Sequence, residues 1–218
     1  MDGGLRYDRR LTEDEMVERA ILDIRSANKM GCKVIRQQYL LSPNGLARIA
    51  PYAEAYGVKV GIEIHNPETP NSPAMMAYRE AIEKSGSKYI GFVPDFGCFA
   101  TKPNKPHWDE ALKNGADLRL LEMARDMRYD AVPMEEAQKR LKENGATTLE
   151  LALLQEMYAF LQFKKDCKKE LEGLKEIMPY CFHMHGKFHY LYEDLTAASI
   201  PYEEILHVVK ESHYNGYI

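Results

Sequence analysis

Short apolar runs that alternate with longer segments of helical spacing are the feature that most constrains the fold of this 218-residue chain. The apolar runs are candidate strands and lie at residues 33–37, 58–64, 88–95 and 179–185, with a further run that begins at 216. Strands that alternate with helices form β-α-β units, in which the sheet is parallel and helices cover it. The sequence therefore predicts an α/β fold.

The predicted helices carry start and stop signals. Thr12 and Glu15 form a capping box ahead of apolar residues spaced three and four apart, and this helix is expected to end at Gly31. Pro43 opens a second helix that stops at Gly57. Further helices are predicted at 72–85 and from 201 onward.

Residues 108–178 have helical spacing with few strand signals, and breaks near 129–133 and at Gly145 divide this stretch. A (β/α)₈ barrel needs eight strand-helix units in about 250 residues. Only five strand candidates are visible in this chain. The pattern therefore predicts either an incomplete barrel or a smaller open α/β sheet.

Charge and hydropathy narrow the classes of partner. The formal net charge is −4 at pH 7, which gives no electrostatic reason to expect nucleic acid or an anionic membrane, since both favour a basic surface. No segment approaches the roughly 18 consecutive apolar residues that span a bilayer, and residues 1–10 lack the apolar core of a signal peptide. We therefore expect a cytoplasmic protein with a small neutral substrate.

Carboxylate and imidazole side chains stand at the carboxyl ends of three predicted strands. Glu63 and His65 end one strand, Asp95 ends the next, and His183 and His185 end a third. The active site of a parallel α/β protein lies at this edge of the sheet. These residues are therefore the candidate functional residues.

Side chains alternate between the two faces of a strand. Glu63 and His65 are therefore expected to point to the same face. By the same count, Cys181 would share the face of the two strand-end histidines, opposite Phe182 and Met184.

Two carboxylates and an imidazole that converge from three strands favour a divalent cation, because a buried charge must be paired or coordinated. A set rich in oxygen with one nitrogen favours Mn²⁺ or Mg²⁺, with Co²⁺ as a further alternative, over structural zinc. Each residue alone has a simpler explanation, since a strand-end carboxylate often caps the next helix and a single histidine is often satisfied by hydrogen bonds. The convergence of three such residues favours a site.

The segments that carry these residues resemble a known superfamily. GIEIHNP, GFVPDFGCF and FHMHGKF, with DIRSANKMGCKVIR before them and HYNGYI after them, resemble the xylose isomerase-like barrel superfamily of sugar isomerases and epimerases. Such enzymes hold one divalent metal with a Glu, an Asp, a His and a second Glu. The resemblance implies that Glu63, Asp95 and His185 are the first three ligands, with Mn²⁺ as the expected metal. His185 is preferred to His183 because it precedes Lys187 in a His-x-Lys pattern.

The resemblance also implies the architecture. We expect an incomplete (β/α)₈ TIM barrel with parallel strands, formed by one partial-barrel domain over 1–218. A helical insertion at about 100–178 would separate the Asp-bearing strand from the His-bearing strand. The superfamily's first three strand-helix units would precede Met1 and its fourth ligand would follow Ile218, so we expect a chain truncated at both ends.

EIHNP, PDFG and HxHGKF are most similar to the α subunits of bacterial C-glycoside deglycosidases. The resemblance implies a complex of two kinds of subunit that cleaves the carbon–carbon bond between a 3-oxo sugar and an aromatic aglycone. Both this lyase chemistry and sugar isomerisation begin with removal of a proton beside a carbonyl or hydroxyl, with a metal stabilising the enediolate oxygen. Glu63 and His65 are the candidate proton-transfer residues, and Lys187, Arg36 and His183 are the candidate substrate-binding residues.

Three functions stay open. The first is a metal-dependent sugar isomerase or epimerase, the second a C–C lyase of the deglycosidase α-subunit type, and the third a non-catalytic binding fragment, which the absent fourth ligand supports. Many members of the superfamily have a His three residues after the Asp, where this chain has Cys98, so the sugar or glycoside is not fixed. The expected partners are a carbohydrate or glycoside and either further copies of the chain or a small second subunit, without nucleic acid or membrane.

Overall fold

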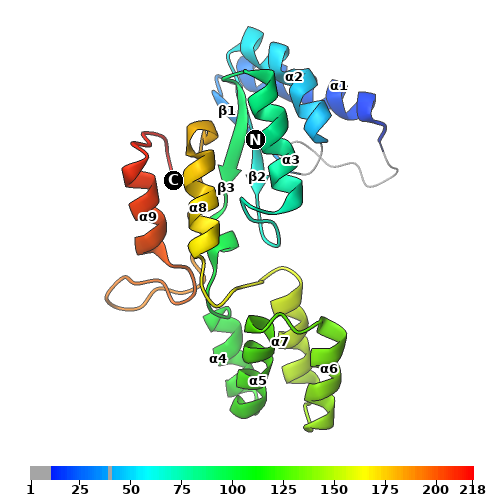
Figure 1. Ribbon diagram of the computed structural model, residues 1–218, viewed down its shortest axis with the longest axis vertical. Helices are drawn as coiled ribbons and strands as arrows, with labels where there is room; N and C mark the ends of the chain where they lie inside the picture. The colour runs from blue at the N-terminus through cyan, green and yellow to red at the C-terminus, as the bar shows by residue number, and fades with distance from the viewer. Residues whose placement is uncertain (1–10, 39–40) are drawn as a thin grey trace.

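Three parallel strands form the centre of the structure, a computed structural model that describes residues 11–38 and 41–218 (Figure 1). The strands are β1 (Val34–Gln37), β2 (Lys59–Ile64) and β3 (Ile90–Pro94), in the order β1-β2-β3. Almost every residue of β2 and β3 is buried, as expected for a parallel sheet that is covered on both faces. The predicted parallel α/β architecture is confirmed.

Helices α1 (Glu13–Lys29), α2 (Pro43–Tyr56) and α3 (Pro73–Ser85) pack against one another and against this sheet. The capping box of Thr12 and Glu15 is present, and α2 ends at Gly57, whose left-handed backbone (φ 63°) favours glycine. These three helices lie where the sequence predicts them. Their apolar faces supply much of the core against the strands.

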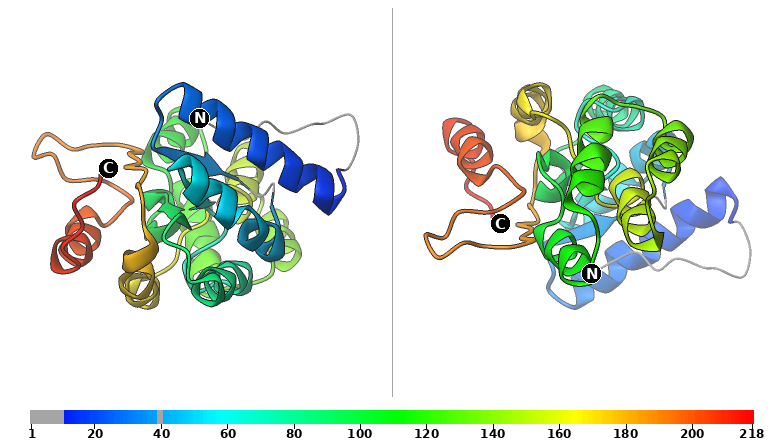
Figure 2. Two further views of the ribbon diagram at one scale, coloured as in Figure 1. Left: turned by 90° about the horizontal axis from the view of Figure 1, so that it is seen from above. Right: turned by 90° about the horizontal axis from the view of Figure 1, so that it is seen from below.

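Helices α8 (Lys168–Ile177) and α9 (Tyr202–Glu211) pack side by side next to β3 (Figure 1). The short 3₁₀ helix η2 (Met178–Tyr180) connects α8 to the segment that runs along β3. Figure 2 shows α9 on the opposite side of the molecule from α1. Helix α9 begins after Pro201, where the sequence predicts it.

The segment at 179–185 is not the regular strand that the sequence predicts. It meets β3 through two isolated parallel bridges, one at each end. The N–H of Phe182 donates to the carbonyl of Phe92 (3.1 Å), and the N–H of His185 donates to that of Pro94 (2.9 Å). From the first of these bonds to the second, the segment thus advances by three residues while β3 advances by two. Pro94 also has no N–H to donate. The segment therefore forms a bulge and not a regular ladder of hydrogen bonds with β3.

Because of the bulge, the predicted alternation of side chains along this segment is wrong. Cys181 and Met184 are both buried in the core, although they were expected on opposite faces. Phe182 instead lies beside Gly91, where an added Cβ would meet the Phe182 ring at 2.8 Å. The predicted run that begins at 216 is not a strand either, and it contacts the segment through the N–H of Met184 and the carbonyl of Tyr217 (3.1 Å).

The four helices that lie between β3 and α8 in the sequence form a lobe of their own, seen at the bottom of Figure 1. They are α4 (Lys105–Lys113), α5 (Leu118–Tyr129), α6 (Met134–Glu143) and α7 (Thr148–Tyr158). We call α4–α7 the helical lobe. Across the two described ranges, no helix combines the length and the apolar character needed to cross a membrane.

Candidate metal centre

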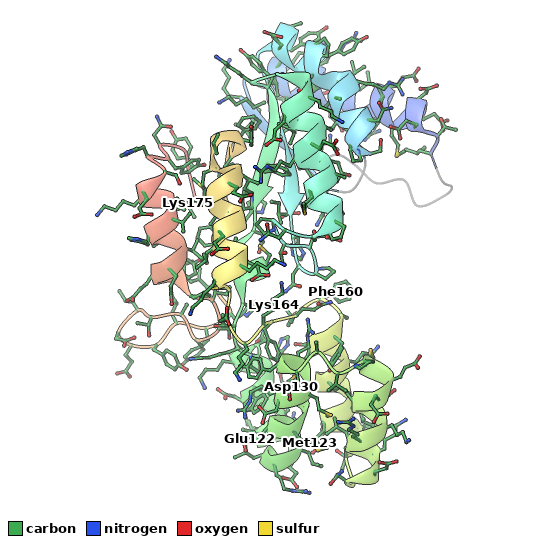
Figure 3. All side chains as sticks on the ribbon, viewed as in Figure 1. Glu122, Met123, Asp130, Phe160, Lys164 and Lys175 are labelled. Atoms are coloured by element: carbon green, nitrogen blue, oxygen red, sulfur yellow. The ribbon has the colours of Figure 1, made fainter. Side chains whose placement is uncertain are left out.

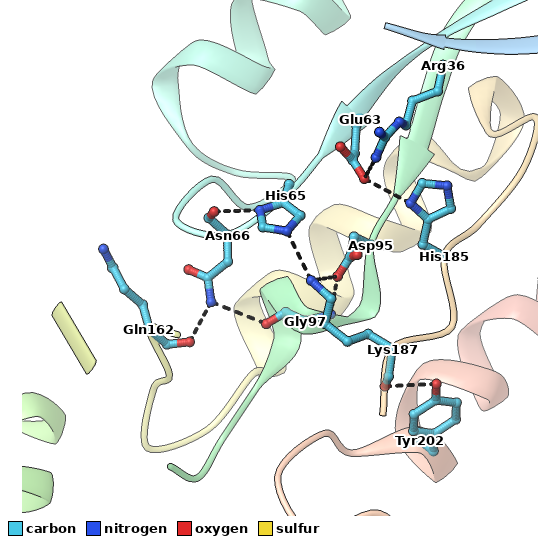
Figure 4. A network of polar contacts seen from close by, with 10 residues as sticks. All are labelled: Arg36, Glu63, His65, Asn66, Asp95, Gly97, Gln162, His185, Lys187 and Tyr202. Carbon is cyan, nitrogen blue, oxygen red and sulfur yellow. Dashed lines mark hydrogen bonds and ion pairs between the residues drawn. The ribbon is translucent and has the colours of Figure 1, made fainter. Parts of the chain in front are cut away.

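Glu63, Asp95 and His185 come together at the carboxyl ends of the strands. Glu63 lies on β2, Asp95 directly follows β3, and His185 lies at the end of the bulged segment. One possible ligand atom from each of the three residues lies within 4.8 Å of the other two (Figure 4). These are the three residues that the sequence predicts as metal ligands.

Glu63 is almost fully buried, with 1% of its surface exposed. Its Oε1 accepts hydrogen bonds from Nη1 of Arg36 (2.6 Å) and from Nδ1 of His185 (2.8 Å). Its Oε2 is buried and has no hydrogen-bond partner within residues 11–38 and 41–218. A buried carboxylate oxygen without a partner is costly, and a bound cation would satisfy it. The donor set therefore fits a divalent metal.

Asp95 makes two contacts through one carboxylate oxygen. Its Oδ1 accepts from the backbone N–H of Gly97 (2.7 Å) and so caps the 3₁₀ helix η1 (Phe96–Phe99). The same oxygen lies 3.1 Å from Nζ of Lys187. The helix-cap explanation of this residue is thus correct, and the cap holds the carboxylate in place at the edge of the sheet.

His65 lies beside this group with a defined hydrogen-bonding pattern. Its Nδ1 is 2.8 Å from the carbonyl oxygen of Asn66, and because a carbonyl only accepts, Nδ1 carries the proton. Its Nε2 is 3.0 Å from Nζ of Lys187, which donates to it. Lys187 therefore lies between His65 and Asp95, and both contacts hold its ammonium group.

The three predicted substrate-binding residues also lie at this edge. Arg36 and His183 line a hollow of about 580 Å³. The other residues of this hollow are Lys33, Val34, Val93, Phe182, His185 and Tyr217. Burial and then the neighbouring His185 lower the pKa of His183, whose ring centroid lies 5.6 Å from that of His185. Arg36 faces the hollow but is ion-paired to Glu63, which the sequence does not reveal.

Two further residues of the site were assigned no role from the sequence. Asn66, which is 8% exposed, donates from Nδ2 to the backbone carbonyls of Gln162 (2.6 Å) and Gly97 (3.4 Å). Asn66 belongs to the GIEIHNP segment, so its position beside His65 was a signal. Gln162 follows the helical lobe and lies 96 residues away in the sequence, and no local pattern points to it.

A cavity larger than this hollow lies elsewhere. It has a volume of about 790 Å³ and lies between α4, α5 and the loop that contains Tyr192. Its charged lining is mostly paired internally, as in Lys105 with Asp109 (2.5 Å) and Arg125 with Asp126 (2.8 Å). The orphaned carboxylate oxygen and the convergent ligands favour the edge of the sheet as the functional site.

Known proteins with similar sequences are subunits of carbohydrate-processing enzymes. The chain is 29% identical over its whole length to a 3'-dehydrocarminate deglycosidase alpha subunit of a Microbacterium species, of which it covers 65%. It is 27% identical to a C-glycoside deglycosidase alpha subunit of Microbacterium trichothecenolyticum, of which it covers 61%. The chain thus spans less than two thirds of the length of these relatives.

A solved structure supports the fold. A D-tagatose 3-epimerase-like protein matches all of this chain and 67% of its own length with a TM-score of 0.51, at 17% sequence identity. No family model matches the chain. The chain is therefore similar in sequence to the alpha subunits of C-glycoside deglycosidases, and the residues that the structure describes have the fold of an incomplete TIM barrel.

Proposed function

We propose that this chain is the part of a metal-dependent enzyme that removes a proton beside the carbonyl of an oxidised C-glycoside, and so releases its aglycone. The observation that carries the proposal is the convergence of Glu63, Asp95 and His185, together with the buried Oε2 of Glu63, which has no hydrogen-bond partner among the residues that the structure describes. The names of the relatives support a C-glycoside as the substrate class and a second, different subunit as the partner.

Glu63, Asp95 and His185 would hold the cation, and an oxygen-rich set with one imidazole favours Mn²⁺, with Mg²⁺ and Co²⁺ as alternatives. A divalent cation bound there polarises the sugar carbonyl and stabilises negative charge on its oxygen. The hydrogen bond from Gly97 to Asp95 and that from Arg36 to Glu63 would hold both carboxylates in position for it.

His65 is the base in this proposal. Its Nε2 takes the proton from the carbon beside the carbonyl, once Lys187 turns its ammonium group from His65 to a sugar oxygen. The electron pair of the broken C–H bond moves to the carbonyl oxygen. When it returns, the carbonyl re-forms and a carbon–carbon double bond forms between the carbon that lost the proton and the carbon that carried the aglycone. The bond to the aglycone breaks in the same step, and the aglycone carbon leaves with that bond's electron pair and receives the proton from His65. No oxidant or reductant is consumed.

A sugar isomerase or epimerase is the second candidate. The buried Oε2 of Glu63 has no hydrogen-bond partner in the described ranges, so the Glu63 carboxylate itself is placed to take a proton. In that reaction the proton returns to a neighbouring carbon, or to the opposite face of the same carbon, and no bond to an aglycone breaks. A binding fragment without catalysis is the third candidate.

Metal content and product analysis together test these candidates. We would measure bound metal by mass spectrometry in the wild-type chain and in Glu63→Gln, Asp95→Asn and His185→Ala, with the exposed carboxylate variant Glu80→Gln as the matched control. Near-stoichiometric metal that only the control retains supports the centre. A folded wild type without metal, with Mn²⁺ supplied, contradicts it.

Two substrates then separate the reactions. Release of a free aglycone from 3'-dehydrocarminate, followed by chromatography, supports the lyase. Interconversion of ketose and aldose without aglycone release supports the isomerase instead. Metal binding without either product supports the binding fragment.

A further inference from the structure

We infer that Phe160 is a specificity-determining residue that stacks on the aromatic aglycone of the substrate. This inference rests on the proposed function, and it names the part of the ligand that the site recognises beyond the sugar. Phe160 lies in the loop between α7 and α8 and is 74% exposed (Figure 3). A phenylalanine that is this exposed on a fixed loop presents a flat apolar surface to a ligand.

The loop that carries Phe160 is fixed on both sides. On one side, the side chain of Gln162 donates to the carbonyls of Tyr158 (3.0 Å) and Ala159 (3.3 Å) and accepts from Arg128 (2.8 Å). On the other side, Phe163 is buried. The backbone that carries the ring is therefore held in place before any ligand arrives, which lowers the conformational entropy lost on binding.

The same loop is attached directly to the candidate active site. The carbonyl of Gln162 accepts a hydrogen bond of 2.6 Å from Asn66, which immediately follows His65. Figure 4 shows Gln162 on the far side of Asn66 from the metal-binding residues. Phe160 is two residues from Gln162, a reach of roughly 7 Å along the chain. A ligand whose sugar lies between the metal-binding residues and His65 can therefore place its remaining part near Phe160.

The chemistry of Phe160 selects an aromatic group. A phenyl ring has no hydrogen-bonding group with which to recognise a sugar hydroxyl, and it gains most by stacking on another flat ring. Phe188, another exposed aromatic of this edge, already stacks on Tyr202 with ring centroids 4.6 Å apart and planes at 9°. Phe160 is thus the better platform for the aglycone.

Calorimetric binding to the 218-residue chain tests this role without requiring turnover. The probes are 3'-dehydrocarminate and the matching 3-oxo monosaccharide, which lacks the aglycone. We expect Phe160→Ala to weaken binding of 3'-dehydrocarminate about threefold to tenfold and to leave the monosaccharide unchanged. Phe160→Tyr should restore the binding. Leu195→Ala, which removes another exposed apolar side chain, is the control and should change neither affinity.

The outcomes separate this inference from the proposed function. If wild type binds 3'-dehydrocarminate and Phe160→Ala binds it equally well, Phe160 has no role in specificity and the inference is wrong. If wild type binds neither probe while retaining its metal, the proposed substrate class is wrong and the inference fails with it. An equal loss for both probes in Phe160→Ala would indicate a structural defect and would also overturn it.

Discussion

Nε2 of His65 lies 3.0 Å from Nζ of Lys187, although 122 residues separate the two in the sequence. The same ammonium group lies 3.1 Å from Oδ1 of Asp95. One cation therefore connects the proposed base with a proposed metal ligand. Because it donates to Nε2, Lys187 also fixes the tautomer of His65, whose one N–H proton is on Nδ1 and faces the Asn66 carbonyl.

Lys187→Met should reduce turnover far more than it reduces metal affinity. Methionine keeps most of the length of the side chain and removes the charge that orients His65 and that, in the proposed mechanism, binds a sugar oxygen. We expect kcat for aglycone release to fall about 100-fold, the lower range for loss of acid-base assistance. The measurement is steady-state kinetics beside a metal titration, with the exposed Lys175→Met as control. An unchanged kcat in Lys187→Met would show that Lys187 takes no part in the reaction.

Metal should stabilise the folded chain through the residues of the candidate centre. A cation that binds only the folded state at 100 times its Kd adds about 2.7 kcal/mol to the free energy of unfolding. For a chain of this size that raises Tm by roughly 5 to 10 °C. Thermal unfolding with Mn²⁺ and with a chelator measures the shift. Glu63→Gln should abolish it, and a shift that persists in this variant would locate the metal elsewhere.

Glu150 should make the helical lobe sensitive to acid. Burial alone would raise the pKa of its carboxyl, but hydrogen bonds from the Thr147 hydroxyl (2.6 Å) and the backbone N–H groups of Asp117 (2.7 Å) and Thr147 (2.8 Å) outweigh burial and lower it to about 2. The ordinary value is 4.5. The folded pKa is thus the lower one, so the carboxylate stabilises the fold above pH 4.5, and this contribution is lost as the pH falls from 4.5 to 2.

We therefore expect Glu150→Gln to reduce the free energy of unfolding by about 3 kcal/mol at pH 7, with the difference from wild type shrinking below pH 4.5. Urea unfolding at several pH values measures this. Glu54→Gln, an exposed carboxylate on α2, is the control and should have little effect at any pH. A constant difference between wild type and Glu150→Gln down to pH 2.5 would contradict the assigned cause.

Gly91→Ala should be strongly destabilising because the bulged segment leaves no room for a methyl group. The added Cβ would lie 2.1 Å from the carbonyl oxygen of Tyr180 and 2.8 Å from the Phe182 ring. We expect a loss of about 3 kcal/mol, at the upper end for overpacking. Gly86→Ala is the comparison, since its Cβ meets open space and only its backbone (φ 63°) opposes alanine, at about 1 kcal/mol. An equal loss of unfolding free energy in both variants, measured by urea unfolding, would show that the bulged segment shifts to make room for the methyl group.

Local signals explain why so much of the fold was predictable. The capping box at Thr12, the left-handed Gly57 and the prolines at Pro43 and Pro201 act within one helical turn, and each marks a helix end in the structure. The convergence of Glu63, Asp95 and His185 also follows from the sequence, because parallel strands bring their carboxyl ends to one edge.

Contacts between distant segments account for what the sequence did not reveal. The bulge at 182–185 depends on Pro94 in the neighbouring strand, so alternation counted along one segment failed there. The sequence alone indicates that Arg36 is a sugar-binding cation. In the structure, the pairing of β1 with β2 brings Arg36 to Glu63, and the two form an ion pair. The bond from Asn66 to Gln162 likewise depends on how the helical lobe returns to the sheet.

The helical lobe also determines the order in which the molecule can assemble. Its helices contact one another within residues 105–158, whereas His185 reaches Glu63 only across 122 residues. Contacts between residues that are close in the sequence form fast, and closing a long loop costs conformational entropy. A lobe that has already folded shortens the flexible chain between Glu63 and His185 and so reduces this cost. Helix formation should therefore precede closure of the centre during refolding. The ability to capture a metal ion would then report the final step of folding, not the first.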